Sequence, residues 1–358
     1  MFFVPDVSVI PSVAEGSHAT LSCDIADYPE GIVIPVDKPY RWTSADVIRK
    51  IKWRAIRHFG KKNLKVGHAG TLDPLATGVL LVCIGPACKR AQELQDHDKE
   101  YIAHIRFGAT TPSYDLEKDV DRTFPFEHIT ADAVRAALPA FLGEQEQVAP
   151  LFSAKSVDGV RAYEMARKLY KRSFVANAPQ DDNSESSFCH SERSEESLFD
   201  AAALETLQRN KIVISELELL DFIAGCDTLP EACPPPDKCR GRGPQDDGTG
   251  SKLAWSPEWH TVGGAGAERS EAESSGRVSL SASTASSRIN VADTSALGLP
   301  EAVIRIACSK GTYIRAFARD LGEALGSGAH LSGLIRSRSG SFGLENALSM
   351  DQALSLFQ

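Results

Sequence analysis

A single acidic side chain interrupts a run of small and apolar residues in the first quarter of the chain. In GHAGTLDPLATGVLLVCIG, residues 67–85, Asp73 is the only carboxylate, and it stands directly before Pro74. A carboxylate in such a place can act as a nucleophile or as a proton acceptor. It can also serve only as the N-cap of a helix, because Asp is a favoured N-cap and Pro a favoured first helical residue.

The surroundings of Asp73 favour the catalytic interpretation. Pro74 disfavours the α conformation at Asp73, so its side chain is expected to project from a loop, and nearby glycines permit a ligand to approach the backbone closely. The preceding residues 50–68, KIKWRAIRHFGKKNLKVGH, contain Lys and Arg but no acid. A charge run is usually only a solvated face. A basic run that carries aromatic residues and leads to a lone carboxylate suggests a phosphate backbone held beside a reacting group.

Hydrophobic periodicity predicts the elements that must position this stretch. Apolar runs typical of strands occupy residues 31–36, 79–84, 101–107, 211–221 and 302–307. Amphipathic patterns predict helices over 44–59, 131–142, 162–170 and 313–325, the first of them capped by Thr43 or Ser44. Strands and helices mix without a regular βαβ repeat, which favours an α+β fold over a doubly wound sheet.

Composition separates a globular part from segments that cannot form a core. The 358 residues are 42% hydrophobic and carry a formal charge of −9. Residues 174–210 and 225–300 are rich in Ser, Gly, Pro, Ala and acids, so we expect two long low-complexity insertions. Residues 1–30 are expected to form a poorly ordered extension. The acids concentrate in these three segments, so the globular part expected over 31–342 is mildly basic once the two insertions are left out.

Several classes of protein are disfavoured. The eight cysteines contain no CxxC pair, and the spacing of the three between residues 226 and 239 does not suit zinc. Neither a secretory signal nor an apolar run of membrane-spanning length is evident, so a cytoplasmic protein with reduced thiols is expected. A phosphate-binding glycine loop and a dinucleotide fingerprint are also absent from the sequence. We therefore expect no metal and no other cofactor.

Several motifs together resemble a known family. GHAGTLDPLATGVL at 67–80 looks like the signature of the TruB family of pseudouridine synthases, which isomerise a uridine in the T-loop of tRNA. GIVIPVDKPYRWTSADVIRKIK, DKEY at 98–101 and APLFSAKSVDGVRAYEMARK resemble further family segments in the same order. CSKGTYIRAFARDLGEALG and AHLSGLIRSRSGSF resemble the closing motifs. The match covers nearly all of the globular part from residue 31 to residue 342.

The resemblance implies a fold and a set of site residues. The fold is that of the pseudouridine synthases, with a mixed, mostly antiparallel central sheet flanked by helices. Asp73 corresponds to the catalytic aspartate, Arg315 to its basic partner and Tyr101 to the tyrosine that stacks on the flipped base. The further positions that the resemblance places against the substrate are His68, Lys99, Tyr313 and Leu334. Taken singly, each of these residues would more often be an ordinary structural residue, and their joint spacing within the family pattern reverses that preference for Asp73, Tyr101 and Arg315.

The implied function is the conversion of a T-loop uridine of tRNA, position 55, to pseudouridine. The implied partner is the T-loop and stem of tRNA, and we expect a monomer that needs no guide RNA and no membrane. Two other functions remain open: a non-catalytic RNA-binding or tRNA-folding factor on the same fold, and a small-molecule hydrolase with Asp73 as nucleophile. The intact set of Asp73, Tyr101 and Arg315 favours the synthase over the first. The basic run at 50–68 counts against the second.

The chain departs from the family pattern in three places. Tyr40 and Arg41 stand where the family usually has a glycine nearby, and Ala149 and Phe152 replace a proline and a tyrosine. Residues 343–358 are expected to be a short tail, without the RNA-binding PUA domain that family members commonly carry. These departures concern fine positioning and affinity, and leave the implied reaction unchanged.

Overall fold

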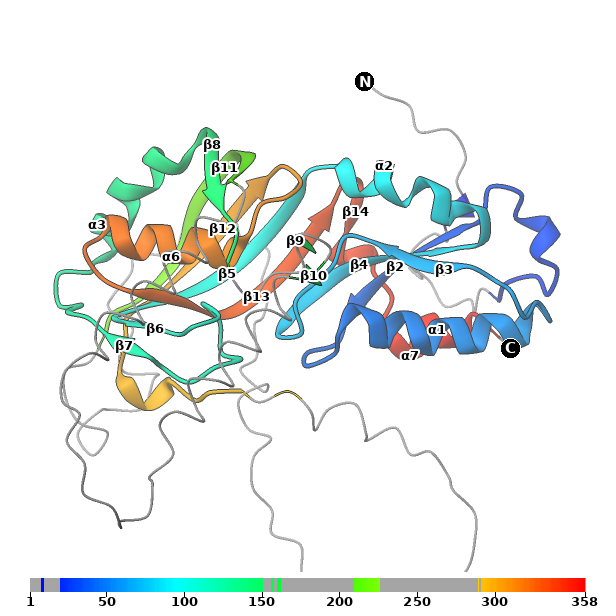
Figure 1. The fold of residues 1–358 in the computed structure, drawn as a ribbon, viewed down its shortest axis with the longest axis horizontal. Helices are drawn as coiled ribbons and strands as arrows, with labels where there is room; N and C mark the ends of the chain where they lie inside the picture. The colour runs from blue at the N-terminus through cyan, green and yellow to red at the C-terminus, as the bar shows by residue number, and fades with distance from the viewer. Residues whose placement is uncertain are drawn as a thin grey trace, which may run out of the picture. The chain divides into compact units, whose positions relative to one another are not determined.

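A mixed β-sheet forms the framework of the molecule (Figure 1). The structure is a computed structural model, and it describes residues 20–150, 209–225, 289 and 291–357, together with the backbone of three two-residue strands outside these ranges. In spatial order the sheet contains β1 (Ser8–Val9), β2 (Ile32–Lys38), β4 (Ala76–Ile84), β13 (Ala329–Ser339), β5 (Lys99–Phe107), β12 (Glu301–Cys308), β11 (Arg209–Ile223) and β8 (Gly143–Val148). β3 (Val66–Ala69) pairs with β4, and β14 (Phe342–Gly343) pairs with β13.

The sheet is mostly antiparallel, which confirms the expected α+β class. β1 with β2 and β4 with β13 are the parallel strand pairs among the described residues. The register places Arg336 of β13 beside Gly78 of β4. Gly78 has a φ of 96°, and a Cβ atom built on it would lie 2.3 Å from the carbonyl oxygen of Arg336. The close approach of these two strands at the centre of the sheet therefore requires glycine at position 78.

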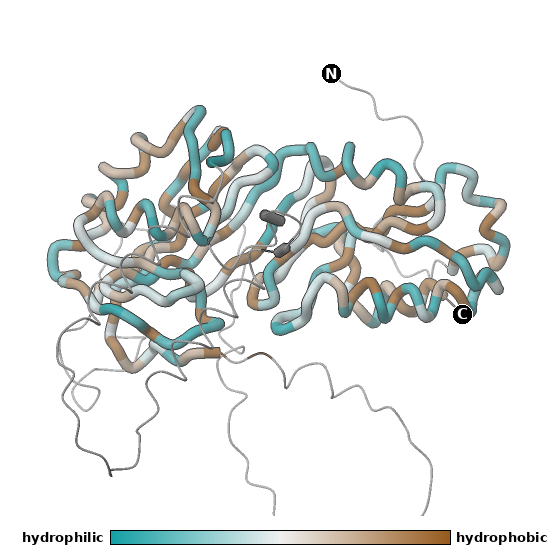
Figure 2. Tube along the Cα trace, viewed as in Figure 1, coloured by the Kyte–Doolittle hydropathy of each residue, from teal (hydrophilic) through white to brown (hydrophobic). Residues whose placement is uncertain are grey.

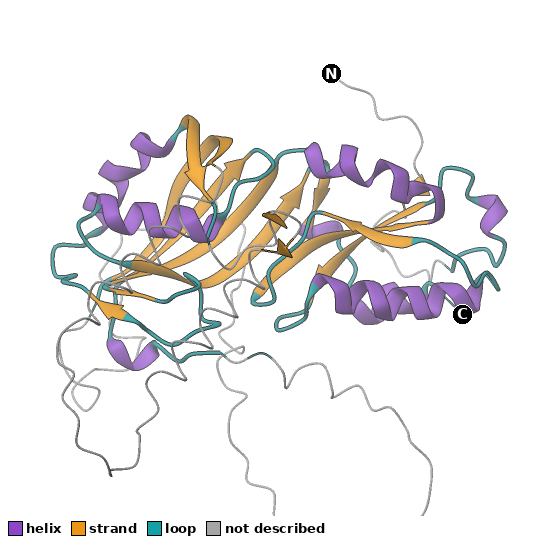
Figure 3. Cartoon of the chain, in the orientation of Figure 1, coloured by secondary structure: helices purple, strands orange, loops and turns teal. Residues whose placement is uncertain are grey.

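Helices pack on both faces of the sheet (Figure 3). α1 (Ser44–His58) and α7 (Met350–Ser355) cover one face over β2 and β4, and α6 (Ile314–Ala324) covers the same face over β5 and β13. α2 (Ala91–Asp96) covers the opposite face, and α3 (Ala131–Ala137) packs beside β11. Apolar residues concentrate in the strands and in the helices packed on them (Figure 2). Small antiparallel pairs are formed by β6 (Ala109–Thr110) with β7 (Arg122–Thr123) and by β9 (Ser156–Val157) with β10 (Val160–Arg161).

α1 follows the sequence prediction closely. The Thr43 hydroxyl accepts a hydrogen bond from the amide of Asp46 (3.1 Å), and the Asp46 carboxylate accepts one from the amide of Thr43 (3.1 Å), which makes a capping box. Val47, Ile51 and Ala55 form a completely buried stripe along the helix. The helix expected over 313–325 is α6, whereas the one expected over 131–142 changes to a 3₁₀ turn after residue 137, where Pro139 removes an amide donor.

The globular unit is larger than composition indicated. The C-terminal segment packs into the core, where Leu356 and Phe357 are 3% exposed, so it is not a free tail. Leu21, expected to lie in a poorly ordered extension, is buried, and its amide donates to the carbonyl of Leu356 (3.1 Å). Isolated apolar residues within polar segments escape a compositional criterion, because only the tertiary structure supplies the site that buries them. The helix expected over 162–170 and Phe152 lie outside the described residues.

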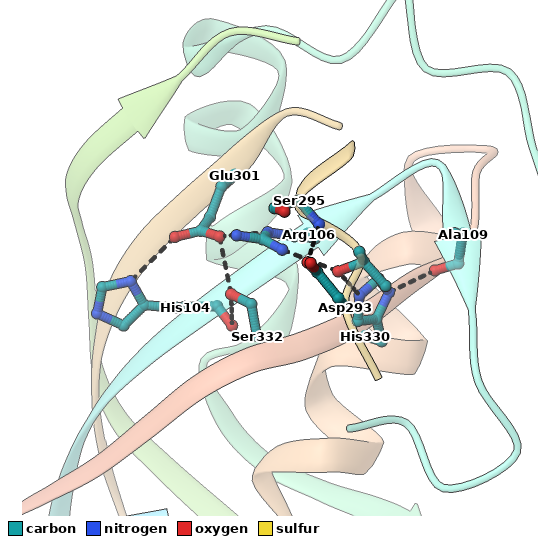
Figure 4. A network of polar contacts seen from close by, with 9 residues as sticks. His104, Arg106, Ala109, Asp293, Ser295, Glu301, His330 and Ser332 are labelled. Carbon is teal, nitrogen blue, oxygen red and sulfur yellow. Dashed lines mark hydrogen bonds and ion pairs between the residues drawn. The ribbon is translucent and has the colours of Figure 1, made fainter. Parts of the chain in front are cut away.

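The insertion boundary expected at residue 300 is corrected by a buried polar network (Figure 4). The strand between the insertions spans residues 209–223, and residues 291–300 already belong to the packed unit. Arg106 donates from Nη1 to the Thr294 hydroxyl (2.8 Å), and the amide of Ala292 donates to the carbonyl of Leu116 (2.8 Å). The segment entering β12 is therefore held against β5 by specific hydrogen bonds.

No helix among the described residues combines the length and the apolar character needed to cross a membrane.

Candidate active site

Asp73 lies in a loop between two strands, and no helix starts there. β3 ends at Ala69, and Asp73 through Ala76 make a turn in which the amide of Ala76 donates to the carbonyl of Asp73 (3.1 Å). β4 then begins at Ala76 and pairs with both β2 and β13. The N-cap interpretation of Asp73 is therefore wrong, because the amides that follow enter a sheet and leave no helix to cap.

Three side chains from different elements hold this loop. Ser44, the first residue of α1, accepts through its hydroxyl from the amide of Leu72 (2.9 Å) and donates to the carbonyl of Leu72 (3.0 Å). Lys38 donates from Nζ to the carbonyl of Pro74 (3.2 Å), and Arg336 donates from Nη2 to the carbonyl of Gly70 (3.3 Å). The main chain is thus fixed on both sides of Asp73, which limits the positions its carboxylate can reach.

Arg315 grips the Asp73 carboxylate through two bonds. Its Nε lies 2.9 Å from Oδ2, and its Nη2 donates to Oδ1 at 3.1 Å. The Arg315 side chain is 5% exposed, whereas the Asp73 side chain is 38% exposed. Two parallel bonds between a planar guanidinium and a carboxylate fix the orientation of the acid as well as stabilising its charge. Arg315 therefore binds one side of the Asp73 carboxylate, and part of the Asp73 side chain stays accessible to solvent.

Asp115 is a second acid at the site that the sequence did not single out. Its Oδ2 lies 3.7 Å from Nη1 of Arg315, while its Oδ1 accepts from the Ser113 hydroxyl (2.7 Å) and from the amide of Glu117 (2.9 Å). Burial raises the pKa of Asp115, and the positive charge of Arg315 opposes that effect. Arg315 also donates to the carbonyl of Ser113 (3.2 Å). The segment around Asp115 therefore supports the arginine on the side away from Asp73.

Tyr114 adopts an unusual backbone conformation that brings its neighbours onto Arg315. Its φ is 56°, a left-handed value that is uncommon for a bulky side chain. The turn closes through a hydrogen bond from the amide of Tyr114 to the carbonyl of Thr111 (3.0 Å). Such strain persists where the surrounding structure fixes it, and it often occurs at functional sites. In sequence, TPSYDL reads only as a turn, so Asp115 carried no signal that distinguished it.

Lys38 is the second functional candidate that the sequence did not reveal. It is completely buried, and its Nζ donates to the carbonyls of Pro39 (3.0 Å) and Trp42 (2.7 Å) as well as to that of Pro74. Burial lowers the pKa of Lys38 to about 7, and the negative charge of Asp73 partly offsets this. The three acceptors match the three N–H donors of an ammonium group. The only sequence signal is a lysine in the predicted turn that follows an apolar strand.

A cavity of about 350 Å³ opens beside Asp73. It brings together most of the residues proposed from the sequence, and those that line it are Asp73, Lys99, Tyr101, Tyr313, Arg315 and Leu334. Arg336 also lines it and is 1% exposed, while the solvent-exposed Lys310 lines it and is paired with Asp96 (3.0 Å). Asp73 is the only carboxylate among the described lining residues, which otherwise include four cations. The cavity therefore offers one acid within a positively charged wall.

Two predicted substrate-binding residues do not present a free polar group to the cavity. Lys99 lines the cavity, but its Nζ donates to the carbonyls of Gln95 and His97, where it satisfies acceptors at the end of α2. His68 lies on β3 outside the cavity lining, and burial lowers its pKa. Its Nδ1 atom is buried and has no hydrogen-bond partner among the described residues. Tyr101 is 8% exposed and presents its ring from β5.

Arg41 bears out one departure noted in the sequence. Its φ is 63°, the left-handed conformation that glycine adopts without strain. Its Nη2 donates to the carbonyl of Ile289 (2.5 Å), so the side chain links the turn after β2 to the end of the second insertion. Arg41 therefore takes up a conformation that glycine would adopt without strain, and its side chain contacts the end of the second insertion.

The chain is similar to proteins of established name. A family model described as TruB family pseudouridylate synthase (N terminal domain) matches residues 57–177. A tRNA pseudouridine synthase B from Phocaeicola vulgatus is 38% identical over 325 residues, covering 91% of this chain and 92% of that protein. Proteins of the same name from Bacteroides thetaiotaomicron and Thermus thermophilus are 39% and 36% identical, covering 90% and 88% of this chain and 91% and 75% of those proteins.

Proposed function

Because the chain belongs to the TruB family of pseudouridylate synthases, as its motifs predicted, we propose that this isomerase converts uridine 55 in the T-loop of tRNA to pseudouridine. One observation carries the proposal. Asp73 is bound on one side by the buried Arg315 and opens on the other into a cavity that is also lined by Tyr101. A structural ion pair has no need of such a cavity.

The reaction can be balanced without an external reagent. The bond between ribose C1′ and N1 of uracil breaks, the detached base turns, and a new bond joins C1′ to C5. The hydrogen on C5 leaves as a proton, and N1 takes one up, so no electrons are gained or lost. A carboxylate can serve by attacking C1′, by attacking C6 of the base or by removing the C5 proton. The Asp73 carboxylate, whose orientation is fixed by Arg315, is suited to each of these steps.

The proposed roles of the other residues follow from their places in the cavity. A uridine must leave its stack to reach Asp73, which costs a few kcal/mol, and the ring of Tyr101 can recover part of this by stacking on the base. Leu334 supplies an apolar wall, while Tyr313 lies at the start of α6 beside Arg315. The cationic lining can neutralise phosphates next to the flipped nucleotide. In this proposal the protein acts as a monomer that needs no guide RNA.

The alternative of a non-catalytic RNA-binding factor gains no support from the geometry. A binding protein needs cations and aromatic rings, but it has no use for a carboxylate that repels phosphate at the centre of the site. The two bonds from Arg315 and the three loop anchors keep that carboxylate in one orientation. Such preorganisation is expected where the group reacts.

The proposal is tested by tritium release from a T-arm stem-loop labelled at C5 of its uridines. We expect release by the wild type and loss of release by Asp73→Asn, which keeps the shape of the side chain but removes its charge. RNA binding by the variant, measured by filter retention, should persist. Absence of release by the wild type with RNA still bound would favour the binding factor. Equal release by both proteins would show that Asp73 has no chemical role.

A further inference from the structure

α1 presents a solvent face that takes no part in the active site described above. Its buried stripe contains Val47, Ile51 and Ala55, and the opposite side carries the residues that we name the α1 basic face: Lys50, Trp53, Arg54 and Arg57. The spacing of Lys50, Trp53 and Arg57 places them along one line of the helix. Trp53 is 54% exposed, which is unusual for the largest apolar side chain.

Aromatic rings organise the cations of this face. The guanidinium carbons of Arg57 and Arg54 lie 4.3 and 5.5 Å from the centre of the Trp53 ring, and Nζ of Lys50 lies 5.3 Å from the Trp42 ring. A guanidinium stacked on a ring keeps the N–H donors along its edge available for a phosphate. The face is thus arranged before any ligand arrives, which reduces the entropy lost on binding.

The positive charge of this face is not neutralised by an ion pair among the described residues. Lys50, Arg54 and Arg57 form no ion pair with a carboxylate in the part of the chain that the structure describes, whereas Arg49 on the same helix binds Asp46 (2.6 Å). The sequence contains no acid between Asp46 and Asp73. An ordinary solvated helix face mixes both signs of charge, often in pairs one turn apart. Uniform sign around an exposed Trp indicates a polyanionic partner.

α1 connects this face to the loop that carries Asp73. The first residue of α1, Ser44, is hydrogen-bonded to Leu72 in the catalytic loop. From Ser44 to Arg57 the helix extends about 20 Å at 1.5 Å per residue. Exposed Lys61, Lys62 and Lys65 follow in the loop that returns to β3. α1 and α6 pack on the same face of the sheet, and Arg315 of α6 binds Asp73 in the catalytic loop.

We propose that the α1 basic face binds the sugar–phosphate backbone of the substrate RNA beyond the nucleotides that enter the cavity. The inference rests on the proposed function only for the identity of the RNA. Lys50, Arg54 and Arg57 contact phosphates, and Trp53 holds the two arginines in place. The contact adds affinity and orients the RNA, and it leaves the chemical step at Asp73 unchanged.

The test compares two triple variants that remove the same charge. Lys50→Gln, Arg54→Gln and Arg57→Gln are combined in one protein, and Arg135→Gln, Arg209→Gln and Arg305→Gln in the control, whose arginines are exposed and paired with acids elsewhere. We expect the first triple to bind full-length tRNA about tenfold to a hundredfold more weakly near 0.1 M salt, with the slope of log affinity against log salt reduced by about 2 to 3. Turnover at saturating tRNA should match the wild type.

Three results would overturn the proposal: unchanged affinity and slope, an equal loss in the control triple, or a loss of saturated turnover in place of affinity. A Trp53→Ala variant should show a smaller loss of affinity with its salt slope nearly unchanged. Repetition with the isolated T-arm stem-loop locates the contact, since a loss with both RNAs places it on that arm and a loss with tRNA alone places it outside. If the wild type binds tRNA but forms no pseudouridine, the proposed function fails, and the binding comparison still decides this inference.

Discussion

Two ionic clusters, one around Glu301 and one around Asp73, lie on opposite faces of the same sheet. The two carboxylates differ in how many groups bind them and in how exposed they are. Glu301 is 13% exposed and is bound by groups from three positions: Nε of Arg106 (2.7 Å), the Ser332 hydroxyl (2.8 Å) and Nδ1 of His104 (3.1 Å). Asp73 is 38% exposed and receives both of its bonds from Arg315. Residues of strands β5 and β13 donate all three of the bonds to Glu301, whereas Asp73 is bound by a single side chain on one side.

The contrast shows why a carboxylic acid with a shifted pKa is a poor marker of the active site in this protein. Burial alone would raise the pKa of Glu301, but the hydrogen bond from His104, the charge of Arg106 and the hydrogen bond from Ser332 lower it to about 2. Glu301 is not among the described residues that line the cavity of about 350 Å³, whereas Asp73 is. Structural networks perturb pKa values as readily as catalytic sites do. Open access to an oriented acid is the distinguishing feature.

The largest expected effect separates the two arginines that hold these acids. Arg315→Lys keeps a positive charge but loses the bidentate interaction with the carboxylate. Asp73 should therefore shift, and kcat should fall about a hundredfold or more. The matched change Arg106→Lys should leave kcat within a factor of about two, because neither Arg106 nor Glu301 lines the cavity. Initial rates at saturating tRNA check both. Comparable losses of kcat in the two variants would mean that the Glu301 network also serves catalysis.

The sequence alone identified much of this site, because its residues lie in recognisable motifs. Asp73, Tyr101 and Arg315 come from three distant segments, and the structure brings them to one cavity as the resemblance implied. The predicted strands and helices that carry them are present, with shifts of a few residues at their ends. Strand β4 starts at Ala76, ahead of the predicted start at residue 79. Its pairing with β13 extends the sheet to the turn that begins at Asp73.

Lys38 and Asp115 could not be found in this way, because their significance is tertiary. Lys38 reads as a turn residue before a proline, and only the carbonyls that converge on Nζ reveal its task. Asp115 reads as part of an ordinary polar turn until Arg315 is placed beside it. Burial of a charge and the arrival of its partner depend on contacts between residues far apart in sequence, which local pattern cannot specify.

A stability measurement sharpens the comparison between the acids themselves. Glu301→Gln should lower the free energy of unfolding at pH 7 by about 3 kcal/mol, because the pKa of Glu301 is lowered from 4.5 to about 2. The folded pKa lies below the unfolded one, so this stabilisation is complete above about pH 4.5 and declines as the pH falls toward 2. The deficit of the variant should therefore shrink between pH 5 and pH 3 in urea unfolding.

Asp73→Asn provides the control for that measurement. Its carboxylate is more exposed than that of Glu301, the amide keeps an oxygen that can accept from Arg315, and Asp115 still lies beside that arginine, so the variant should unfold within about 1 kcal/mol of the wild type at pH 7. Pseudouridine formation per folded molecule should be retained by Glu301→Gln and lost by Asp73→Asn. A deficit of Glu301→Gln that stayed constant down to pH 3 would contradict the assignment of its stabilisation to the ionised carboxylate.

The smallest effect comes from one substitution made in both regions. Ser44→Ala removes the two hydrogen bonds to Leu72 beside Asp73, and Ser332→Ala removes one donor from Glu301. Each should cost about 1 kcal/mol of stability, because buried groups of the partner lose a hydrogen bond. Their effects on catalysis should differ.

Ser44→Ala frees the loop that carries Asp73 and should lower kcat severalfold with KM nearly unchanged, since the orientation of Asp73 matters most in the transition state. Ser332→Ala should leave kcat unaltered, although it lies on the same strand as Leu334. If the two variants lose stability and kcat in the same proportion, general loosening of the sheet explains both, and the loop anchor at Ser44 has no separate role in positioning Asp73.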